Sequence, residues 1–447
     1  MNNSGFLKRC AAGVTALLTC FSMSAFAVSA AAVPGDVNND GSVTAADMVR
    51  MKNYLLGIGT LTDSERAGAD LNDDLGINII DFVLLKSMFI NDGATSENTI
   101  QLKGDTVEAS GEGITVEGTS VTISRSGAYT ISGKMTTDAT ITVSAAAEDI
   151  EDVEITLDNV SMTNTSDTPC IMIENAEKTK ITFEGTNVLT NTYDVLEAAS
   201  AAIYAKDDIS FTKKSTGTLK INTNACMAVY CNNDISLNGG TIEIKTDSDG
   251  SGIAESDAVK AKGNIELKGA DVSINTEGDG IKSTKNAVVI NQGTVSIKSG
   301  KDALQGETAV TITGGSVTAS GDRGITSVGA LNISGGTVLA TATDNQSSYA
   351  SSDFTQPVLA LDFPEIHTKS EKVILYPTDE AAGALIYVSN KKYSYVLISD
   401  PAFTEGNKYQ ICIDSDYCAS AEGTETVYSG SEMFTHIKGL YPLKPPL

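Results

Sequence analysis

A short apolar pattern recurs at nearly constant spacing through the middle of the chain, and it limits the possible folds more than any other feature. The repeat is marked by six anchor residues, which are Ile203, Val229, Val259, Ile281, Leu304 and Ile325. Successive anchors are 26, 30, 22, 23 and 21 residues apart. An alternating apolar pair follows each anchor, as Ile265 and Leu267 follow Val259, and a third pair such as Val272 and Ile274 comes after a turn. Alternation with a period of two residues predicts short strands with one buried face.

Three strands within about 22 residues cannot bury their apolar sides alone, but stacked repeats share one continuous core. The sequence therefore predicts a mainly β fold, a parallel β-helix with three strands per coil. A β-sandwich also has many short strands, but it gives no reason for three strand pairs to recur in a fixed order. Looser units upstream, such as Ile155 with Leu157, suggest that coils begin near residue 100. We predict the β-helix over residues 99–345 and a β-rich cap over 346–447, where the period ends and seven of the nine prolines lie.

Residues 1–27 have the form of a secretory signal peptide. Lys8 and Arg9 precede an apolar run that ends at the small-x-small pattern of Ala25 and Ala27. A lipoprotein signal at Cys20 is the alternative. No other segment has the ~20 apolar residues that a membrane span requires. We therefore expect a secreted, extracellular protein, and the pairing of its five remaining cysteines stays open.

The overall charge narrows the choice of partners. The chain has 57 acidic and 31 basic residues, a formal charge of −26, and two histidines. This charge argues against nucleic-acid binding, which needs a basic surface. It also makes acidic polymers poor partners unless a divalent cation lies between the two negative surfaces. Two histidines leave little room for a His-rich zinc site or a His-based catalytic triad.

Two twelve-residue segments near the N-terminus place oxygen-bearing groups at the spacing of a calcium-binding loop. The first supplies Asp36, Asn38, Asp40, the carbonyl of Ser42, Thr44 and Asp47. The second begins 34 residues after the first and supplies Asp70, Asn72, Asp74, Gly76, Asn78 and Asp81. Leu75 occupies the sharp-turn position that Gly41 has in the first loop, so we expect the second loop to be strained or shifted by one residue. The sequence predicts bound Ca²⁺ in both loops.

Each loop is followed by a short helical pattern, and no clear entering helix precedes either loop. In these respects residues 35–90 resemble the type I dockerin module of cellulosomal proteins. The resemblance implies a small all-α domain that folds with calcium and binds a cohesin domain on a scaffold protein. It places the cohesin contacts at Ala45, Ala46, Lys52, Ile79, Ile80 and Lys86. The two apolar pairs differ, which argues against a fully symmetric binding mode, and the lysines have the alternative of being solvated helix charges. Residues 91–98 are polar and predict a linker.

Stacking turns repeated positions of the array into rows along its surface. The residue after each anchor points outward, which gives the candidate ligand-binding row Tyr204, Tyr230, Lys260 and Lys282. A second row consists of Asp257, Asp279 and Asp302. Stacked carboxylates repel one another unless cations intervene, so this row is a candidate calcium site. In the alternative interpretation the lysines neutralise the row and the aspartates cap turns.

Diffuse motifs over residues 98–420 include Asp257-Ala-Val-Lys260, Asp279-Gly-Ile-Lys282 and Tyr393-Ser-Tyr-Val396. With them the array resembles clostridial carbohydrate-binding β-helix proteins related to family 9 polysaccharide lyases. The resemblance implies a right-handed parallel β-helix that holds calcium and binds plant cell-wall polysaccharide, either cellulose-like or uronate-containing. The chain has no Trp, so the tyrosines of the ligand-binding row would have to provide the stacking surface.

The sequence leaves three functions open. The leading hypothesis is a non-catalytic polysaccharide-binding protein carried on a cellulosome. The second is a calcium-dependent pectate-type lyase with Lys260 or Lys282 as base, although neither lysine has an arginine beside it in sequence. The third is a structural or adhesive β-helix without sugar specificity, which the dockerin resemblance disfavours.

Overall fold

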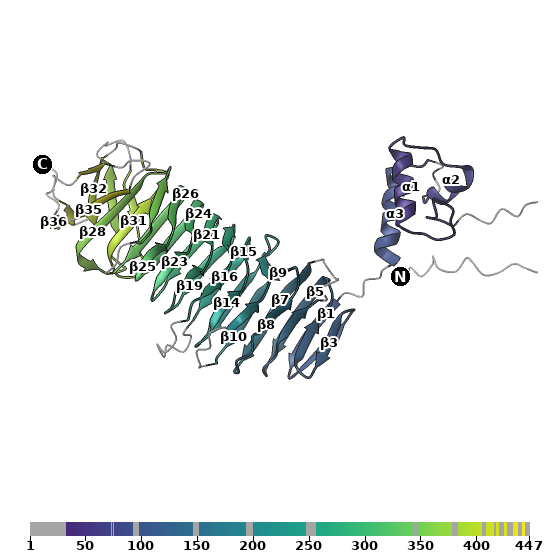
Figure 1. Cartoon of the computed structure of the whole chain (residues 1–447), viewed down its shortest axis with the longest axis horizontal. Coiled ribbons are helices and arrows are strands. Elements are labelled where there is room, and N and C mark those ends of the chain that lie inside the picture. Colours follow the sequence, from purple (N-terminus) through teal and green to yellow (C-terminus); the bar gives the residue numbers. More distant parts are fainter. Residues whose placement is uncertain are drawn as a thin grey trace, which may run out of the picture. The chain divides into compact units, whose positions relative to one another are not determined.

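The computed structural model describes residues 33–72, 74, 76–92, 98–145, 152–193, 200–246, 256–343, 347–377, 383–404, 408–414, 417–419, 424–426, 432–436 and 440–442. The predicted signal peptide lies outside these residues. The chain divides into two compact units, residues 1–94 and 95–447, and each is described by itself (Figure 1). In the part of the chain that is described, no helix has the length and apolarity needed to cross a membrane.

The first unit contains the helices α1 (Ala45–Leu55), α2 (Asp63–Ala69) and α3 (Ile79–Asp92). Their common core is small and consists of Val37, Met51, Leu61, Ala69 and Leu85. The expectation that no helix enters the second loop is wrong, because α2 precedes this loop directly and has its C-cap at Asp70.

Capping boxes fix the beginnings of two of these helices. Thr44 and Asp47 form the box of α1, and Thr62 and Glu65 form the box of α2. In each box two side chains accept backbone N–H groups that have no partner within the helix. Glu65 also pairs with Arg50 of α1 at 2.7 Å, and this ion pair joins the two helices.

The second unit is built from three series of parallel strands, and each strand pairs with the equivalent strand of the next repeat. The first series is β4 (Ser120–Ile123), β6 (Ile141–Ser144), β8 (Ile171–Asn175), β11 (Ala201–Ala205), β14 (Met227–Cys231), β17 (Val259–Ala261), β20 (Ile281–Ser283), β23 (Asp302–Gly306) and β25 (Arg323–Ser327). The second is β1 (Asn98–Gly104), β5 (Gly127–Met135), β7 (Val153–Asn164), β9 (Lys178–Glu184), β12 (Asp208–Phe211), β15 (Ile235–Leu237), β18 (Ile265–Lys268), β21 (Ala287–Gln292), β24 (Ala309–Gly321), β26 (Ala330–Ala342) and β27 (Ser351–Phe354). The third is β10 (Thr186–Asn191), β13 (Thr218–Thr223), β16 (Thr241–Lys245), β19 (Asp271–Asn275) and β22 (Thr294–Lys298), continued by the later residues of β7, β24 and β26.

The apolar anchors align across the first series as the sequence predicts. Consecutive anchors are Cα partners, from Ile203 with Val229 to Leu304 with Ile325, so their predicted alignment is confirmed. The second and third apolar pairs also keep register, for example Val272 with Val295. These side chains belong to one continuous hydrophobic cluster. The second unit is therefore a mainly β array of parallel strands stacked around a shared core, as the successive arrows of Figure 1 show.

Glycine is needed where one strand series turns into the next. Gly293, between β21 and β22, has φ +95°, a conformation that side-chain-bearing residues rarely adopt. A Cβ atom added there would lie 2.2 Å from the carbonyl oxygen of Ala270 in the preceding repeat. The close approach of stacked turns thus requires the glycine that recurs in the sequence.

Antiparallel strands lie at both ends of the stack. At one end β2 (Thr106–Ser110) pairs with β1, and β3 (Ile114–Glu117) pairs with β4. At the other end β31 (Tyr393–Ser399) runs antiparallel to β26 and to β28 (Val358–His367). Such partners satisfy backbone groups that an open edge would offer to another chain. The remaining strands are β29 (Val373–Pro377), β30 (Leu385–Tyr387), β32 (Lys408–Ile413), β33 (Tyr417–Ala419), β34 (Thr424–Thr426) and β36 (Leu440–Pro442), which form a small antiparallel sheet, and β35 (Glu432–His436), which pairs with β28.

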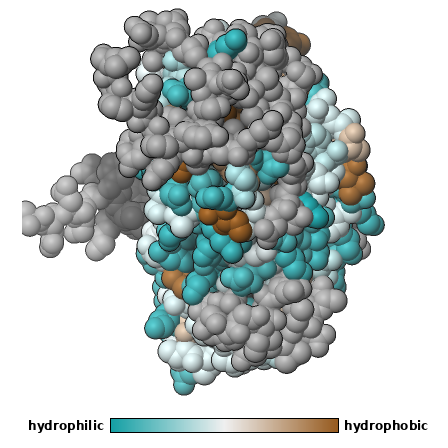
Figure 2. All heavy atoms as spheres, turned by 90° about the vertical axis from the view of Figure 1, so that its left-hand side faces the viewer, coloured by the Kyte–Doolittle hydropathy of each residue, from teal (hydrophilic) through white to brown (hydrophobic). Residues whose placement is uncertain are grey.

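The described surface at the C-terminal side of the array is mainly hydrophilic, and its apolar atoms form small separate patches (Figure 2). Cys170, Cys226 and Cys231 are buried free thiols, and burial raises the pKa of each to about 12. Cys412 is disulfide-bonded, and Cys418 is its cross-strand neighbour. The cysteine pairing that the sequence left open therefore does not join Cys226 to Cys231.

Candidate functional site

The first predicted calcium loop is organised by two acidic side chains. Asp36 accepts the backbone N–H groups of Asp40 and Gly41 at 3.0 and 2.8 Å. Asp47 accepts the backbone N–H groups of Asn38 and Thr44 at 2.8 and 2.7 Å. Asp36 is 4% exposed and Asp47 is fully buried. The loop therefore closes around two buried carboxylates.

The second loop repeats this arrangement with small differences. Asp81 is fully buried and accepts two backbone N–H groups, one of them from Asn78, at 2.9 Å each. Asp74 accepts the N–H group of Gly76 at 2.8 Å, and this hydrogen bond is the main reason why the pKa of Asp74 lies below its ordinary value. Leu75, where we expected strain, lies outside the described residues.

Asparagine side chains connect the acids within each loop. Asn38 donates from Nδ2 to Asp40 at 2.7 Å, and Asn72 donates to Asp74 at 2.8 Å. Within the described residues, no three Asp, Glu, His or Cys side chains gather as a cluster that by itself suits a metal ion. A cation in these loops would therefore depend on amide, hydroxyl and carbonyl oxygens as well as on carboxylates.

The chemistry of this donor set fits Ca²⁺, which prefers oxygen ligands of these kinds. The printed partners of Asp36, Asp47 and Asp81 in the described part of the chain are N–H and hydroxyl groups, and no ion pair neutralises their charge. Burying an ionised carboxylate without a counter-charge is costly, so a divalent cation would stabilise both loops.

The predicted cohesin contacts lie on two equivalent exposed faces. In α1 the face consists of Ala45, Ala46, Val49 and Lys52, and in α3 it consists of Ile79, Ile80, Val83 and Lys86. Positions i, i+1, i+4 and i+7 share one side of a helix. Val49 and Val83, each 57% exposed, are the members that the sequence prediction missed. The two valines are 34 residues apart, which is the repeat length of the loops, and this spacing could have identified them from the sequence.

The tyrosines of the predicted ligand-binding row form a packed pair in the array. The rings of Tyr204 and Tyr230 lie 5.6 Å apart between centroids and are tilted by 54°. Tyr230 is only 8% exposed, and the hydroxyl of Tyr204 accepts a hydrogen bond from Asn232 at 3.0 Å. This pair offers a sugar little open ring surface.

The aspartate row forms ion pairs with the two lysines of the predicted ligand-binding row. Lys260 pairs with Asp257 at 2.9 Å, and Lys282 pairs with Asp279 at 2.5 Å. The backbone N–H of Asp279 also donates to Asp257, and that of Asp302 donates to Asp279. The ion pairs match the alternative interpretation, in which lysines neutralise the row. The aspartates, which that interpretation expected to cap turns, accept backbone N–H groups of the next repeat.

Asp302, the last acid of the aspartate row, has no lysine at the equivalent position to neutralise its charge. The position equivalent to Lys282 in the next repeat is Gln305, and Asp302 pairs with Arg323 at 3.5 Å. Burial and the charge of Asp279 raise the pKa of Asp302. Burial would lower the pKa of Lys282, but the hydrogen bond and charge of Asp279 outweigh it and raise that pKa.

These differences predict opposite effects for two similar substitutions. Asp279→Asn should lower the free energy of unfolding at pH 7 by about 2–3 kcal/mol, because it leaves Lys282 half-buried without its partner. Asp302→Asn should raise the thermal midpoint at pH 7, because it removes a carboxylate whose ionised form burial disfavours. The raised pKa means that folded Asp302 binds its proton before the unfolded chain does, so the gain should shrink as the pH falls towards 3.8. Thermal unfolding of both variants from pH 7 to pH 4 checks this, and equal losses in both would contradict it.

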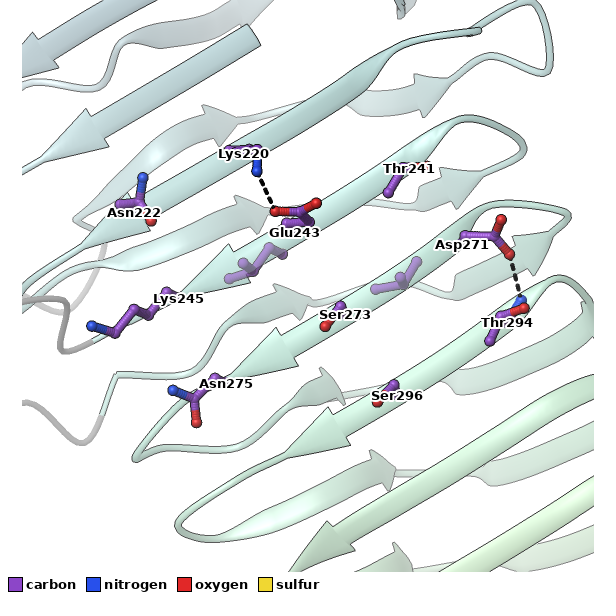
Figure 3. A pocket seen from close by; sticks show the side chains of 12 residues that line it. Lys220, Asn222, Thr241, Glu243, Lys245, Asp271, Ser273, Asn275, Thr294 and Ser296 are labelled. Carbon is purple, nitrogen blue, oxygen red and sulfur yellow. Dashed lines mark hydrogen bonds and ion pairs between the residues drawn. The ribbon is translucent and has the colours of Figure 1, made fainter. Parts of the chain in front are cut away.

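A groove of about 540 Å³ crosses the third series of strands, and we call it the polar groove. Its outward side chains form rows across β13, β16, β19 and β22: Lys220, Glu243, Ser273 and Ser296; Asn222, Lys245 and Asn275; and Thr241, Asp271 and Thr294. Lys220 pairs with Glu243 at 2.7 Å, and Asp271 accepts the N–H of Thr294 at 3.0 Å (Figure 3). Asn390, just before β31, donates to Ser296 at 3.0 Å and so contacts the groove at β22. The sequence alone did not reveal this groove, because its lining residues come from four strands that are far apart along the chain.

Comparisons with known proteins agree with the two units. A model of the dockerin type I domain matches residues 34–90. A family model described as carbohydrate-binding domain-containing protein matches residues 117–356, more than half of the chain. A carbohydrate-binding domain-containing protein of Acetivibrio thermocellus is 32% identical over 168 residues, which are 36% of this chain and 52% of that protein. The chain thus spans about half the length of this curated relative.

One solved structure is also similar in part. It is the polysaccharide lyase-like protein from C. thermocellum, in a gadolinium derivative, with 26% identity and a TM-score of 0.43. The match covers 57% of this chain and 99% of that chain. From the two family models, this chain carries a type I dockerin domain and belongs to the family of carbohydrate-binding domain-containing proteins.

Proposed function

We propose that this chain is a secreted, cellulosome-associated protein that binds a scaffold cohesin through its dockerin domain and plant cell-wall polysaccharide through its array. The proposal keeps the domains derived from the sequence: a signal peptide at 1–27, a dockerin at 35–90, a linker at 91–98, a carbohydrate-binding domain at 99–345 and a cap at 346–447. Their boundaries shift slightly, because α3 extends to Asp92, β1 begins at Asn98, and β27 continues the array beyond residue 345. The observation that carries it is the presence, on one chain, of two matched helix faces and an array with polar rows.

Calcium belongs to this proposal as the ion that stabilises the dockerin loops. Asp36, Asn38, Asp40, the Ser42 carbonyl, Thr44 and Asp47 would hold one ion, and Asp70, Asn72, Asp74, the Gly76 carbonyl, Asn78 and Asp81 would hold the other. The ion supplies positive charge between buried acids. The chain itself positions α1 and α3 behind the loops through the hydrogen bonds of Asp47 and Asp81.

We propose that the array is a right-handed parallel β-helix with three strands per coil. The support is that three successive strands, for example β17, β18 and β19, each pair with the equivalent strand of the next repeat. Neighbouring strands are about 4.8 Å apart. Rows of outward side chains therefore run across the strands in the direction in which the coils stack, and a linear polymer can contact several repeats at once.

The polar groove is the surface best suited to a polysaccharide. Its hydroxyl, amide and charged groups, among them Asn222, Ser273 and Asn275, can donate to and accept from sugar hydroxyls. The row of Tyr204, Tyr230, Lys260 and Lys282 suits a sugar less well, because Tyr230 is buried and both lysines are already paired with aspartates.

A bulky side chain in the polar groove tests this assignment. Ser273→Trp should weaken retention of the protein on insoluble cell-wall polysaccharide at least about tenfold, because the indole would fill the floor of the groove. Gln305→Trp, on the first strand series, is the matched control and should bind as the parent does. Depletion isotherms on cellulose measure both. If Ser273→Trp binds the polysaccharide normally and Gln305→Trp does not, the binding site is instead the row that contains Tyr204 and Lys282.

The pectate-type lyase is the weaker alternative. A general base must be neutral at the working pH, but Lys282 is ion-paired and its pKa is raised. Arg323, the arginine of the core coils, faces Asp302 rather than a lysine. We therefore expect no unsaturated product when the protein is incubated with polygalacturonate and calcium, and ultraviolet absorbance of the product checks this.

A further inference from the structure

A second groove of the array, of about 410 Å³, has a charge opposite to that of the chain as a whole. We call it the lysine groove. Its lining includes five lysines and one acid: Lys178, Lys180, Lys213, Lys214, Lys268 and Glu154. The lysines come from β9, from the turn after β12 and from β18, and register brings these segments together. A chain with a net charge of −26 thus has, among its described residues, a groove lined by more lysines than acids.

Not all of these ammonium groups are neutralised by the protein. Lys180 pairs with Asp152 and with Glu154, the latter at 3.2 Å, and Lys268 pairs with Glu266. Lys178, Lys213 and Lys214 form no ion pair with any residue that the structure describes, and the last two are exposed. Three lysines without an ion pair among the described residues therefore line the groove.

Uncharged donors and acceptors lie beside these lysines. The hydroxyls of Thr182 and Thr212 are hydrogen-bonded at 2.7 Å, and Asn238 donates to the hydroxyl of Ser210 at 2.9 Å. All four line the groove. Hydroxyl and amide groups next to ammonium groups are the combination that recognises a sugar carrying an anionic substituent.

We propose that the lysine groove binds an anionic, carboxylate-bearing polysaccharide directly through its ammonium groups, without a bridging cation. This inference rests on the proposed polysaccharide-binding function and adds a second, charge-selective site to it. At about 0.1 M salt the Debye length is about 10 Å, so distant acids of the chain are largely screened at the groove. The charged groups that line the groove, five lysines and one glutamate, then determine the interaction.

The same observations disfavour a nucleic acid. A nucleic acid carries a much denser line of charge, of which three separated lysines can neutralise only a small part. Single strands are normally held by base stacking on aromatic side chains, and none of the described residues that line the lysine groove is aromatic. A polymer with one carboxylate on each sugar matches three separated cations better.

Affinity electrophoresis of the full chain tests the proposal. The gels contain polygalacturonate, a neutral soluble β-glucan or no polymer, and they are run with chelator in about 20 mM or about 200 mM NaCl. The parent should be retarded by polygalacturonate despite the chelator, and the higher salt should weaken the interaction about tenfold. The variant Lys178→Glu, Lys213→Glu, Lys214→Glu should lose at least about tenfold in affinity, because it removes three charge-assisted contacts.

A matched control makes the same change in charge elsewhere. Lys285→Glu, Lys369→Glu, Lys372→Glu alters three exposed lysines outside both grooves and should behave as the parent does. Thermal unfolding of each variant verifies that the fold is kept. Ser273→Trp should keep its affinity for polygalacturonate through the lysine groove.

The outcomes separate the two proposals. If the parent binds polygalacturonate but the groove variant and the control bind equally well, the lysine groove is not the site and polysaccharide binding stands. If binding needs calcium, or if a single-stranded oligonucleotide binds as tightly as polygalacturonate, the direct recognition of a carboxylated glycan is wrong. If neither polymer is bound, both the inference and the proposed function fail.

Discussion

Replacing Asp36 and Asp70 together with alanine is expected to abolish cohesin binding and to lower the helix content of the dockerin domain. Asp36 accepts two backbone N–H groups and Asp70 accepts the N–H of Asp74, so each organises its own loop. Each is also the first of the proposed calcium ligands. A metal that binds only the folded loop contributes its binding free energy to folding. We expect the affinity for a cohesin to fall by more than about 100-fold.

The measurement is surface plasmon resonance with an immobilised cohesin, in calcium and in chelator, with far-ultraviolet circular dichroism as the readout of folding. Asp63→Ala is the matched control, because Asp63 is an exposed acid of α2 outside both loops. Chelator added to the parent should cause the same losses of cohesin affinity and helix content as the double substitution. Full cohesin affinity of the double variant, or of the parent in chelator, would contradict the assignment of the loops.

Placing charges on the exposed face of α3 is expected to have the second large effect. Ile80→Asp with Val83→Asp should weaken cohesin binding about 100-fold or more, since burying an isoleucine contributes about 1.5–3 kcal/mol and a charge at the same place must be desolvated. The equivalent change in α1, Ala46→Asp with Val49→Asp, should have a smaller effect because alanine buries less apolar area.

The control for this comparison adds the same charges away from both faces. Ile58→Asp with Ala67→Asp alters exposed residues of the first unit and should leave cohesin binding within a few-fold of the parent. Titration calorimetry resolves the three variants. Equal losses from the α1 and α3 changes would show that both faces serve equally, and no loss from either would place the cohesin contact elsewhere.

The repeat of 34 residues made most of the dockerin domain predictable from sequence. It located the loops, the following helices and six of the eight residues on the exposed faces. α2 was missed because Asp63–Ala69 is short and has no apolar periodicity. The sequence did contain a signal for it, since Thr62 and Glu65 have the spacing of a capping box.

Apolar periodicity also predicted the register of the array, because a slip by one residue would turn every buried side chain outward. The pairing of Lys282 with Asp279 was one of two interpretations that the sequence left open. The burial of Tyr230 was not predictable, because it depends on packing of residues outside its own strand.

The two grooves could not be predicted from the sequence. Lys178, Lys213 and Lys268 are widely separated in sequence and come together through the register of four strands. The total charge of −26 pointed to a cation bridge as the condition for binding an acidic polymer. Three lysines that form no ion pair with the described residues line one groove and supply a local alternative, which the net charge of the whole chain does not reveal.

In the proposed function, one chain binds a cohesin and a polysaccharide at the same time. Co-sedimentation of a labelled cohesin with insoluble plant cell-wall polysaccharide tests it most directly. With the full chain and calcium present, the cohesin should sediment with the polymer, and omitting the chain or using the Asp36→Ala, Asp70→Ala variant should leave it in solution. A cohesin that stays in solution while the parent chain sediments, or a parent chain that does not sediment, would contradict the claim.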